Sequence, residues 1–95
     1  MIVWQWIKNK KPVNISVKQR REGNVIVVCG RTLEICYLNK IGGQILEWSD
    51  GFNTLNDVEK QLLKIYDVDE QELRRDIVDL IRDLQWKRLI KLEGE

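Results

Sequence analysis

A change of hydrophobic period at Asn39 divides this chain into two parts. Before Asn39, apolar and polar residues alternate, and Val13, Ile15 and Val17 show the pattern of a half-buried strand. After Asn39, apolar residues recur every three or four positions, which is the spacing of amphipathic helices. A chain of 95 residues has room for one core, so the two parts must share it. The sequence therefore predicts a single α+β domain in which a sheet is followed by helices.

The expected sheet is a three-stranded antiparallel meander. Its middle strand is apolar on both faces, and its third strand can leave an open edge. Glycine supplies the positive φ that the first turn needs. The strands are expected at residues 13–18, 25–29 and 33–38, with a polar turn at residues 20–24 and a two-residue turn at residues 30–31.

Three helices are expected after the sheet, each with a polar residue that caps its first turn. Residues 49–51 end the first helix, and residues 90–92 form a final extended segment. Asp57 follows the second cap by three positions, as in a capping box. The three caps are Asn39, Thr54 and either Asp67 or Asp69.

The chain has no histidine and only two cysteines, Cys29 and Cys36. A structural zinc site and an iron–sulfur cluster both need more ligands than these two thiols supply. No Ser-His or Cys-His pair can form, which removes the common activated nucleophiles. Most carboxylates fall at exposed helix positions. We therefore predict a protein that is not an enzyme and that has no metal and no cofactor.

The two cysteines are predicted to be free thiols. With a two-residue turn at residues 30–31, Cys29 lies opposite Thr32, four positions from Cys36. At about 3.4 Å per residue this separation is roughly 13 Å, beyond the ~7 Å limit for the Cα atoms of a disulfide.

The charge is uneven along the chain, because residues 1–40 hold eight basic and two acidic residues. A basic half attracts an acidic partner, whether peptide, protein or nucleic acid. No apolar run approaches the ~20 residues that span a bilayer, and no signal peptide is recognisable, so a cytoplasmic protein is expected. Trp4, Trp6 and Ile2 would share one side of an extended N-terminal segment. They either pack on the sheet or form a docking patch for a partner or for a second copy in a homodimer.

Several short motifs, in this order and spacing, resemble those of the PqqD-like family. They are Leu38-Asn39, Gly42-Gly43, Ile45-Leu46, Asp50-Gly51 and the cap Thr54. Pro12 ahead of the first strand and the acidic stretch at residues 66–69 also fit, so the likeness covers residues 12–92. It implies a winged helix-turn-helix domain over residues 12–95, preceded by an aromatic and basic extension at residues 1–11.

The resemblance also implies a function. Members of the family are called RiPP recognition elements, where RiPP denotes a ribosomally made and post-translationally modified peptide. They bind the leader segment of a precursor peptide and present it to a separate modifying enzyme, such as a radical-SAM enzyme or a lasso-type leader peptidase. The leader adds as a strand to the third β-strand and packs against the third helix. The strand residues that this implies here are Leu33, Glu34, Ile35, Cys36, Tyr37 and Leu38.

The third helix has a shoulder that could form the other wall of such a groove. At 100° per residue, four side chains lie roughly 80–140° from Leu73, with Arg82 just beyond. In this interpretation the apolar side chains of the shoulder contact hydrophobic side chains of the leader, and the arginines bind carboxylates of the leader. Alternatively, the apolar members widen the core stripe, and the arginines form solvated pairs with Glu70 and Asp79. The four side chains are Arg74, Val78, Ile81 and Gln85.

The rival functions are DNA binding, which winged helices often perform, and a structural adaptor without a peptide ligand. A helix that reads DNA presents basic and amide side chains with few acids. Asp76, Asp79 and Asp83 instead interrupt the third helix, so phosphate repulsion would weaken DNA binding. The sequence does not choose among precursor peptides or modifying enzymes.

Overall fold

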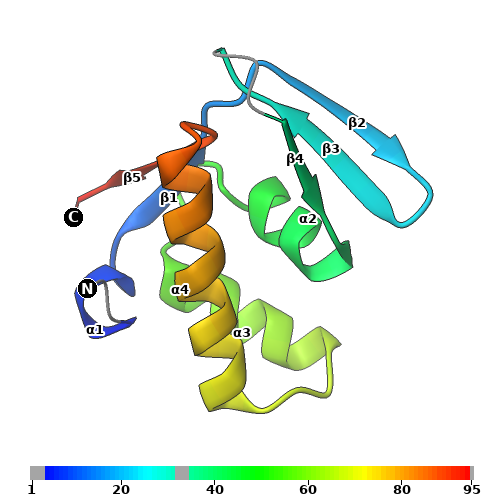
Figure 1. The fold of residues 1–95 in the computed structure, drawn as a ribbon. Coiled ribbons are helices and arrows are strands. Elements are labelled where there is room, and N and C mark those ends of the chain that lie inside the picture. The colour runs from blue at the N-terminus through cyan, green and yellow to red at the C-terminus, as the bar shows by residue number, and fades with distance from the viewer. Residues whose placement is uncertain (1–3, 32–34, 95) are drawn as a thin grey trace.

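The computed structural model describes residues 4–31 and 35–94 of the chain. It has the predicted α+β architecture, a three-stranded antiparallel sheet followed by helices (Figure 1). The described residues add a short N-terminal helix and a second, two-stranded sheet that the sequence did not predict. The helices are α1 (Trp4–Ile7), α2 (Lys40–Glu47), α3 (Leu55–Ile65) and α4 (Glu70–Trp86), and the strands are β1 (Lys11–Asn14), β2 (Lys18–Glu22), β3 (Val25–Cys29), β4 (Ile35–Leu38) and β5 (Ile90–Glu93).

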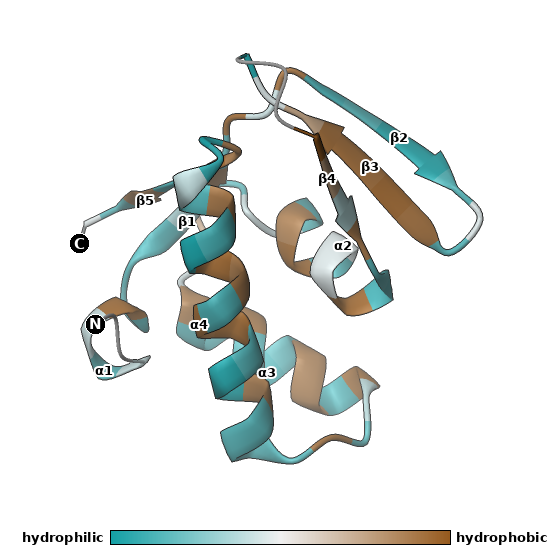
Figure 2. Ribbon diagram, viewed as in Figure 1, coloured by the Kyte–Doolittle hydropathy of each residue, from teal (hydrophilic) through white to brown (hydrophobic). Residues whose placement is uncertain are grey.

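The larger sheet has the order β2-β3-β4, and both pairings are antiparallel. Its first strand is therefore Lys18–Glu22 and not residues 13–18, and the predicted polar turn at residues 20–24 belongs mostly to a strand. Only two residues turn the chain, with Gly23 at a φ of 61°. Every residue of β2 is exposed, so the strand has no apolar alternation that could reveal it. Figure 2 shows the contrast between hydrophilic β2 and hydrophobic β3.

The smaller sheet pairs β1 with β5, and Val13 lies opposite Lys91. This confirms the final extended segment and corrects the predicted first strand, which stops at Asn14. The side-chain oxygen of Asn14 accepts hydrogen bonds from the backbone N–H of Ser16 at 2.9 Å and from its hydroxyl at 2.6 Å. This local turn interrupts the strand, as asparagine side chains commonly do.

The predicted caps are confirmed for all three helices of the second half. The Asn39 side chain accepts a hydrogen bond from the N–H of Gly42 at the start of α2. Thr54 and Asp57 form a reciprocal capping box on α3. Asp69, one of the two candidates, caps α4 by accepting from the N–H of Glu72. Each cap satisfies a backbone donor that has no partner within its helix.

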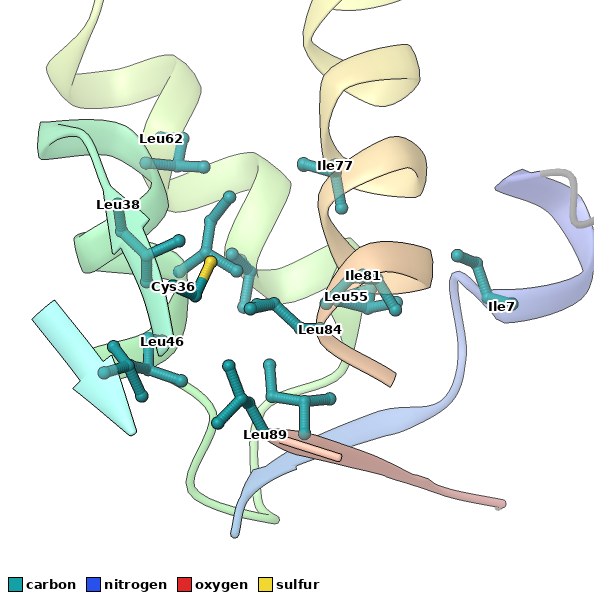
Figure 3. Close-up of a cluster of buried hydrophobic side chains, with 14 of the residues drawn as sticks. Ile7, Cys36, Leu38, Leu46, Leu55, Leu62, Ile77, Ile81, Leu84 and Leu89 are labelled. Carbon is teal, nitrogen blue, oxygen red and sulfur yellow. The ribbon is translucent and has the colours of Figure 1, made fainter. Parts of the chain in front are cut away.

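The core is formed jointly by α1, the sheets and the helices (Figure 3). Ile7 of α1 is only 3% exposed and belongs to this core. The described part of residues 1–11 is therefore integrated with the domain, and Trp4 and Trp6 lie on a helix instead of an extended segment. Ile2 lies outside the described residues. Trp4 packs against the core, whereas the Trp6 side chain is 69% exposed.

Both cysteines are free thiols, but not for the predicted reason. Cys29 pairs with Ile35, and Cys36 pairs with Val28. The connection is therefore longer than two residues, and Thr32, which was expected opposite Cys29, lies outside the described residues. Because neighbouring residues of a strand point to opposite faces, the two thiols lie on opposite faces of the sheet.

Gly43 allows α2 to lie close against β3. A Cβ atom at this position would lie 2.3 Å from Cδ1 of Ile26 and 3.1 Å from its Cγ1. At Gly42 the nearest atom would be Asn39 Oδ1 at 3.3 Å, an approach that small shifts can relieve. The glycine pair weakens the helix by about 1 kcal/mol per residue relative to alanine, and close packing on the sheet explains the second member.

We expect Gly43→Ala to lower the free energy of unfolding by about 1–3 kcal/mol, because overpacking outweighs the gain in helix propensity. Gly42→Ala should be nearly neutral and serves as the matched control. Urea titrations of both variants provide the measurement. Adding Ile26→Val, which removes the atom nearest to the new methyl group, should recover part of the loss. Equal stability of the two alanine variants would contradict the explanation.

Candidate functional site

The two edges of the larger sheet differ in charge. Edge strand β2 carries Lys18, Arg20, Arg21 and Glu22. Edge strand β4 has the sequence Ile-Cys-Tyr-Leu and carries no charge. Charged residues on an edge strand discourage other chains from pairing with it. β2 is protected in this way, whereas β4 is not.

β4 has one buried side and one exposed side. Cys36 and Leu38 are buried in the core, while Ile35 is 52% and Tyr37 is 71% exposed. The strand pairs with β3 along one edge only. Of the six strand residues predicted to bind a peptide, these four form the described edge. The other two, Leu33 and Glu34, lie outside the described residues.

β4 is the strand of its sheet that lies nearest α4 (Figure 1). The Nζ atom of Lys87, at the end of α4, lies 3.9 Å from Sγ of Cys36 and 3.1 Å from Oδ2 of Asp83. Burial raises the pKa of the Cys36 thiol, and the nearby Lys87 ammonium only partly opposes this effect. Cys36 is therefore a neutral thiol at physiological pH, and the Asp83–Lys87 pair marks the side of α4 that faces the strand.

A surface hollow of about 540 Å³ that is open to solvent, here called the cavity, lies along the second half of α4. Two predicted site residues, Arg82 and Gln85, line it, and the Trp86 indole is 86% exposed at its end. Sequence reasoning missed the remaining lining residues as a group, although their helical spacing could have revealed them. The cavity is lined by Asp79, Arg82, Asp83, Gln85 and Trp86.

Two apolar residues of the predicted shoulder belong to the core instead. Ile81 is 0% exposed, so its side chain cannot meet a peptide at the surface. Val78 is half-buried and packs against the same core. The core stripe of α4 is therefore widened, as the alternative interpretation expected, because Ile81 joins Leu73, Ile77 and Leu84.

Arg74 is held by other parts of the protein. Its guanidinium is hydrogen-bonded to the carboxylate of Glu59 on α3, which is only 3% exposed, and lies 2.8 Å from Glu70. It also lies over the Trp4 ring, 5.6 Å from the centroid. Hydrogen bonding to Glu59 raises the pKa of Arg74, so the group stays charged. The helix pair with Glu70, which the alternative interpretation expected, is present, and the leader contact of Arg74 stays a prediction.

α1 and β4 lie on opposite sides of α4 (Figure 3). Arg74 faces α1 through Trp4, whereas Asp83 approaches β4 through Lys87. The predicted shoulder therefore does not form one wall opposite the strand. The side chains of α4 near β4 come from its last turns, in and beside the cavity.

The exposed surface of α4 is rich in carboxylates. Among the described residues Arg82 forms no ion pair, so the predicted pair with Asp79 is absent there. The described residues contain no group of three histidine, cysteine or acidic side chains able to hold a metal ion. In the same part of the chain, no helix has the length and apolar character to cross a membrane. The exposed acids of α4 are Glu70, Glu72, Asp76, Asp79 and Asp83.

The chain is similar to a known protein family and to a solved structure. Residues 26–90 match the family model described as Coenzyme PQQ synthesis protein D (PqqD). A solved structure described as TbiB1 in complex with the TbiA(beta) leader peptide has a TM-score of 0.70 and 23% sequence identity. The match covers 90% of this chain and 96% of that one, and it confirms the expected fold. No curated protein matches the sequence.

Proposed function

The chain belongs to the PqqD family, and from this premise we propose that it is a RiPP recognition element. In this role it binds the leader segment of a ribosomally made precursor peptide and presents it to a separate modifying enzyme in the cytoplasm. It has no catalytic activity and no cofactor of its own. The leader adds antiparallel to β4 and lies between this strand and the end of α4.

The uncharged open edge of β4 is the observation that carries this proposal. An edge strand offers unpaired N–H and C=O groups that any extended peptide can satisfy. The charges of β2 disfavour the other edge. Addition at β4 would also bring the peptide beside the cavity on α4, because Lys87 contacts both Asp83 of the cavity and Cys36 of β4. The fold likeness to a structure determined with a leader peptide supports the same mode.

Backbone pairing along β4 supplies affinity, and the cavity supplies selection among sequences. Arg82, Gln85 and the exposed Trp86 are the side chains that a bound leader would meet there. Ile35 and Tyr37 extend along the same strand with exposed side chains. Arg74 and Ile81 are not part of this proposed site, since one is paired elsewhere and the other is buried.

The modifying enzyme is a radical-SAM enzyme or a leader peptidase. Trp6, exposed on α1, is a candidate contact for this enzyme or for a second copy of the chain. DNA binding is disfavoured, because the exposed carboxylates of α4 would repel phosphates.

Leader binding should protect the backbone amides of Ile35–Leu38 from hydrogen exchange. The reason is that added strand pairing shields N–H groups that face solvent in the free protein. The measurement is exchange monitored by NMR, with and without a synthetic leader segment of a candidate precursor peptide. β2 (Lys18–Glu22) is the internal control.

Amides of β2 should exchange equally fast in both samples, because that edge is charged and distant from the site. Protection of β2 alone would move the site to the opposite edge. An unchanged exchange rate at β4, in the presence of saturating leader, would refute strand addition.

A further inference from the structure

The N-terminal segment holds α4 from the side opposite β4. This segment, residues 4–14, comprises α1, the following turn and β1, and we call it the brace. It lies outside the stretch of the chain that matches the family model. Its contacts connect three elements, namely the start of α3, the body of α4 and the strand that follows α4.

The brace first supplies hydrogen-bond acceptors to the N-terminus of α3. The carbonyl of Lys10 accepts a hydrogen bond from the N–H of Leu55 at 3.0 Å, and the carbonyl of Lys8 accepts from the N–H of Asn56 at 2.9 Å. The first N–H groups of a helix have no partner within the helix. Thr54 and the brace together therefore satisfy the first turn of α3.

The brace also contacts the N-terminal half of α4. The Trp4 ring lies beneath the guanidinium of Arg74, which is bound in turn to Glu59 of α3 and to Glu70. Ile7, three positions after Trp4, is buried in the core. A cation over an indole contributes about 0.5–2 kcal/mol, depending on its desolvation. The position of α4 against α3 thus depends on both ends of α1.

The end of α4 is held through β5. β1 pairs with β5 over four residues, and β5 begins soon after α4 ends. The N–H of Ile15, directly after the brace, donates to the carbonyl of Leu89 at 3.0 Å. Leu89 itself donates its N–H to Leu84 of α4 at 2.8 Å. The brace therefore restrains α4 in its N-terminal half and at its C-terminal end.

We propose that the brace is a positioning element that sets the distance of α4 from β4, with Trp4 as its positioning residue. This inference rests on the proposed function, because that distance is the width of the leader site. A site whose walls are held in the bound geometry binds more tightly than one that must be ordered by its ligand. Trp4 is not among the described residues that line the cavity, and its ring lies under Arg74, so it acts through Arg74 and α4.

The test compares Trp4→Ala with Trp6→Ala, a matched control on the same short helix whose parent side chain is exposed. Leader affinity is measured by calorimetry at a temperature where circular dichroism shows each variant folded. Trp4→Ala should weaken binding by about tenfold or more, as a loss of preorganisation predicts. Trp6→Ala should bind like the parent. Trp4→Phe keeps an aromatic face beneath Arg74 and should retain most of the leader affinity of the parent protein.

A role limited to stability would lower the melting temperature of Trp4→Ala and leave the affinity of the folded protein unchanged, and this result would overturn the proposal. If Trp4→Ala does not fold, Trp4→Leu replaces it, since leucine keeps bulk but offers no aromatic face. NMR shifts give a second readout without leader. The amides of Asp83, Lys87 and Cys36 should shift in the Trp4 variant and not in Trp6→Ala.

The two proposals fail in different ways. If the parent protein shows no protection of β4 by the leader, the proposed function is wrong, while the NMR shifts still test the brace. If the parent binds and the folded Trp4 variants bind equally well without shifts at α4 and β4, the brace has no positioning role.

Discussion

Ile81→Asp is expected to leave the protein largely unfolded. The Ile81 side chain is 0% exposed and lies among the apolar residues of α4 and its neighbours. An unpaired carboxylate in such a place costs several kcal/mol. The total stability of a domain of this size is about 5–15 kcal/mol, so this single substitution removes much of it. Far-UV circular dichroism at 25 °C and a urea titration provide the measurement.

Arg82→Asp is the matched control, because residue 82 is the next position on the same helix and is exposed. It introduces the same side chain and should leave the protein folded. Ile81→Val should also fold, with a loss of about 0.5–1.5 kcal/mol. A folded Ile81→Asp protein would mean that α4 is rotated relative to the structure and that residue 81 faces the surface.

Arg74→Met is expected to lower the melting temperature more than Arg82→Met does. Arg74 is the ion-pair partner of Glu59, whose side chain is 3% exposed. Removing the arginine leaves a buried carboxylate uncompensated, which is strongly destabilising even where the intact pair contributes little. Methionine retains the apolar stem, so the comparison isolates the charge. Differential scanning calorimetry gives the two melting temperatures.

A second substitution separates loss of charge from loss of packing. Glu59→Gln in the Arg74→Met background removes the unpaired charge and should recover part of the melting temperature. If the double variant melts no higher than Arg74→Met, the destabilisation arises from lost contacts with Trp4 instead. Salt should affect the Arg74–Glu59 pair less than the exposed Arg20–Glu22 pair, since buried charges are screened less.

The helices could be predicted from the sequence because their signals are local. Asn39, Thr54 and Asp69 each stand immediately before an apolar periodic segment, and each caps the helix that was expected there. A cap and the residues it serves lie within three positions of one another. The sequence therefore contains both partners of the interaction in one short window.

β2 and α1 could not be predicted in this way. β2 is exposed along its whole length and forms by pairing with β3, so its residues carry no pattern of burial. α1 has four residues and is stabilised by tertiary contacts, such as burial of Ile7 and the stacking of Trp4 on Arg74. Such contacts join residues far apart in sequence and leave no local signal.

The residues of the candidate site were proposed from two sources. The strand at residues 35–38 and the contributions of Arg82 and Gln85 follow from the family resemblance and from the helical period. The pairing of Arg74 with Glu59 could not be predicted, because Glu59 lies 15 positions away on another helix. The pairing rule for helix surfaces identifies only the partner four positions away, Glu70.

The pairing of β1 with β5 has a consequence for the order of synthesis. Lys11–Asn14 leave the ribosome long before Ile90–Glu93 are made, so β1 lacks its partner strand for most of translation, although its bridge to Asp50 can form earlier. Contacts between such distant positions require closure of a long loop and form late in folding. We expect nascent chains that lack β5 to hold α4 loosely, as truncations in ribosome-bound complexes could reveal by proteolysis. In the proposed function, capture of a precursor peptide would then begin only after β5 has paired with β1.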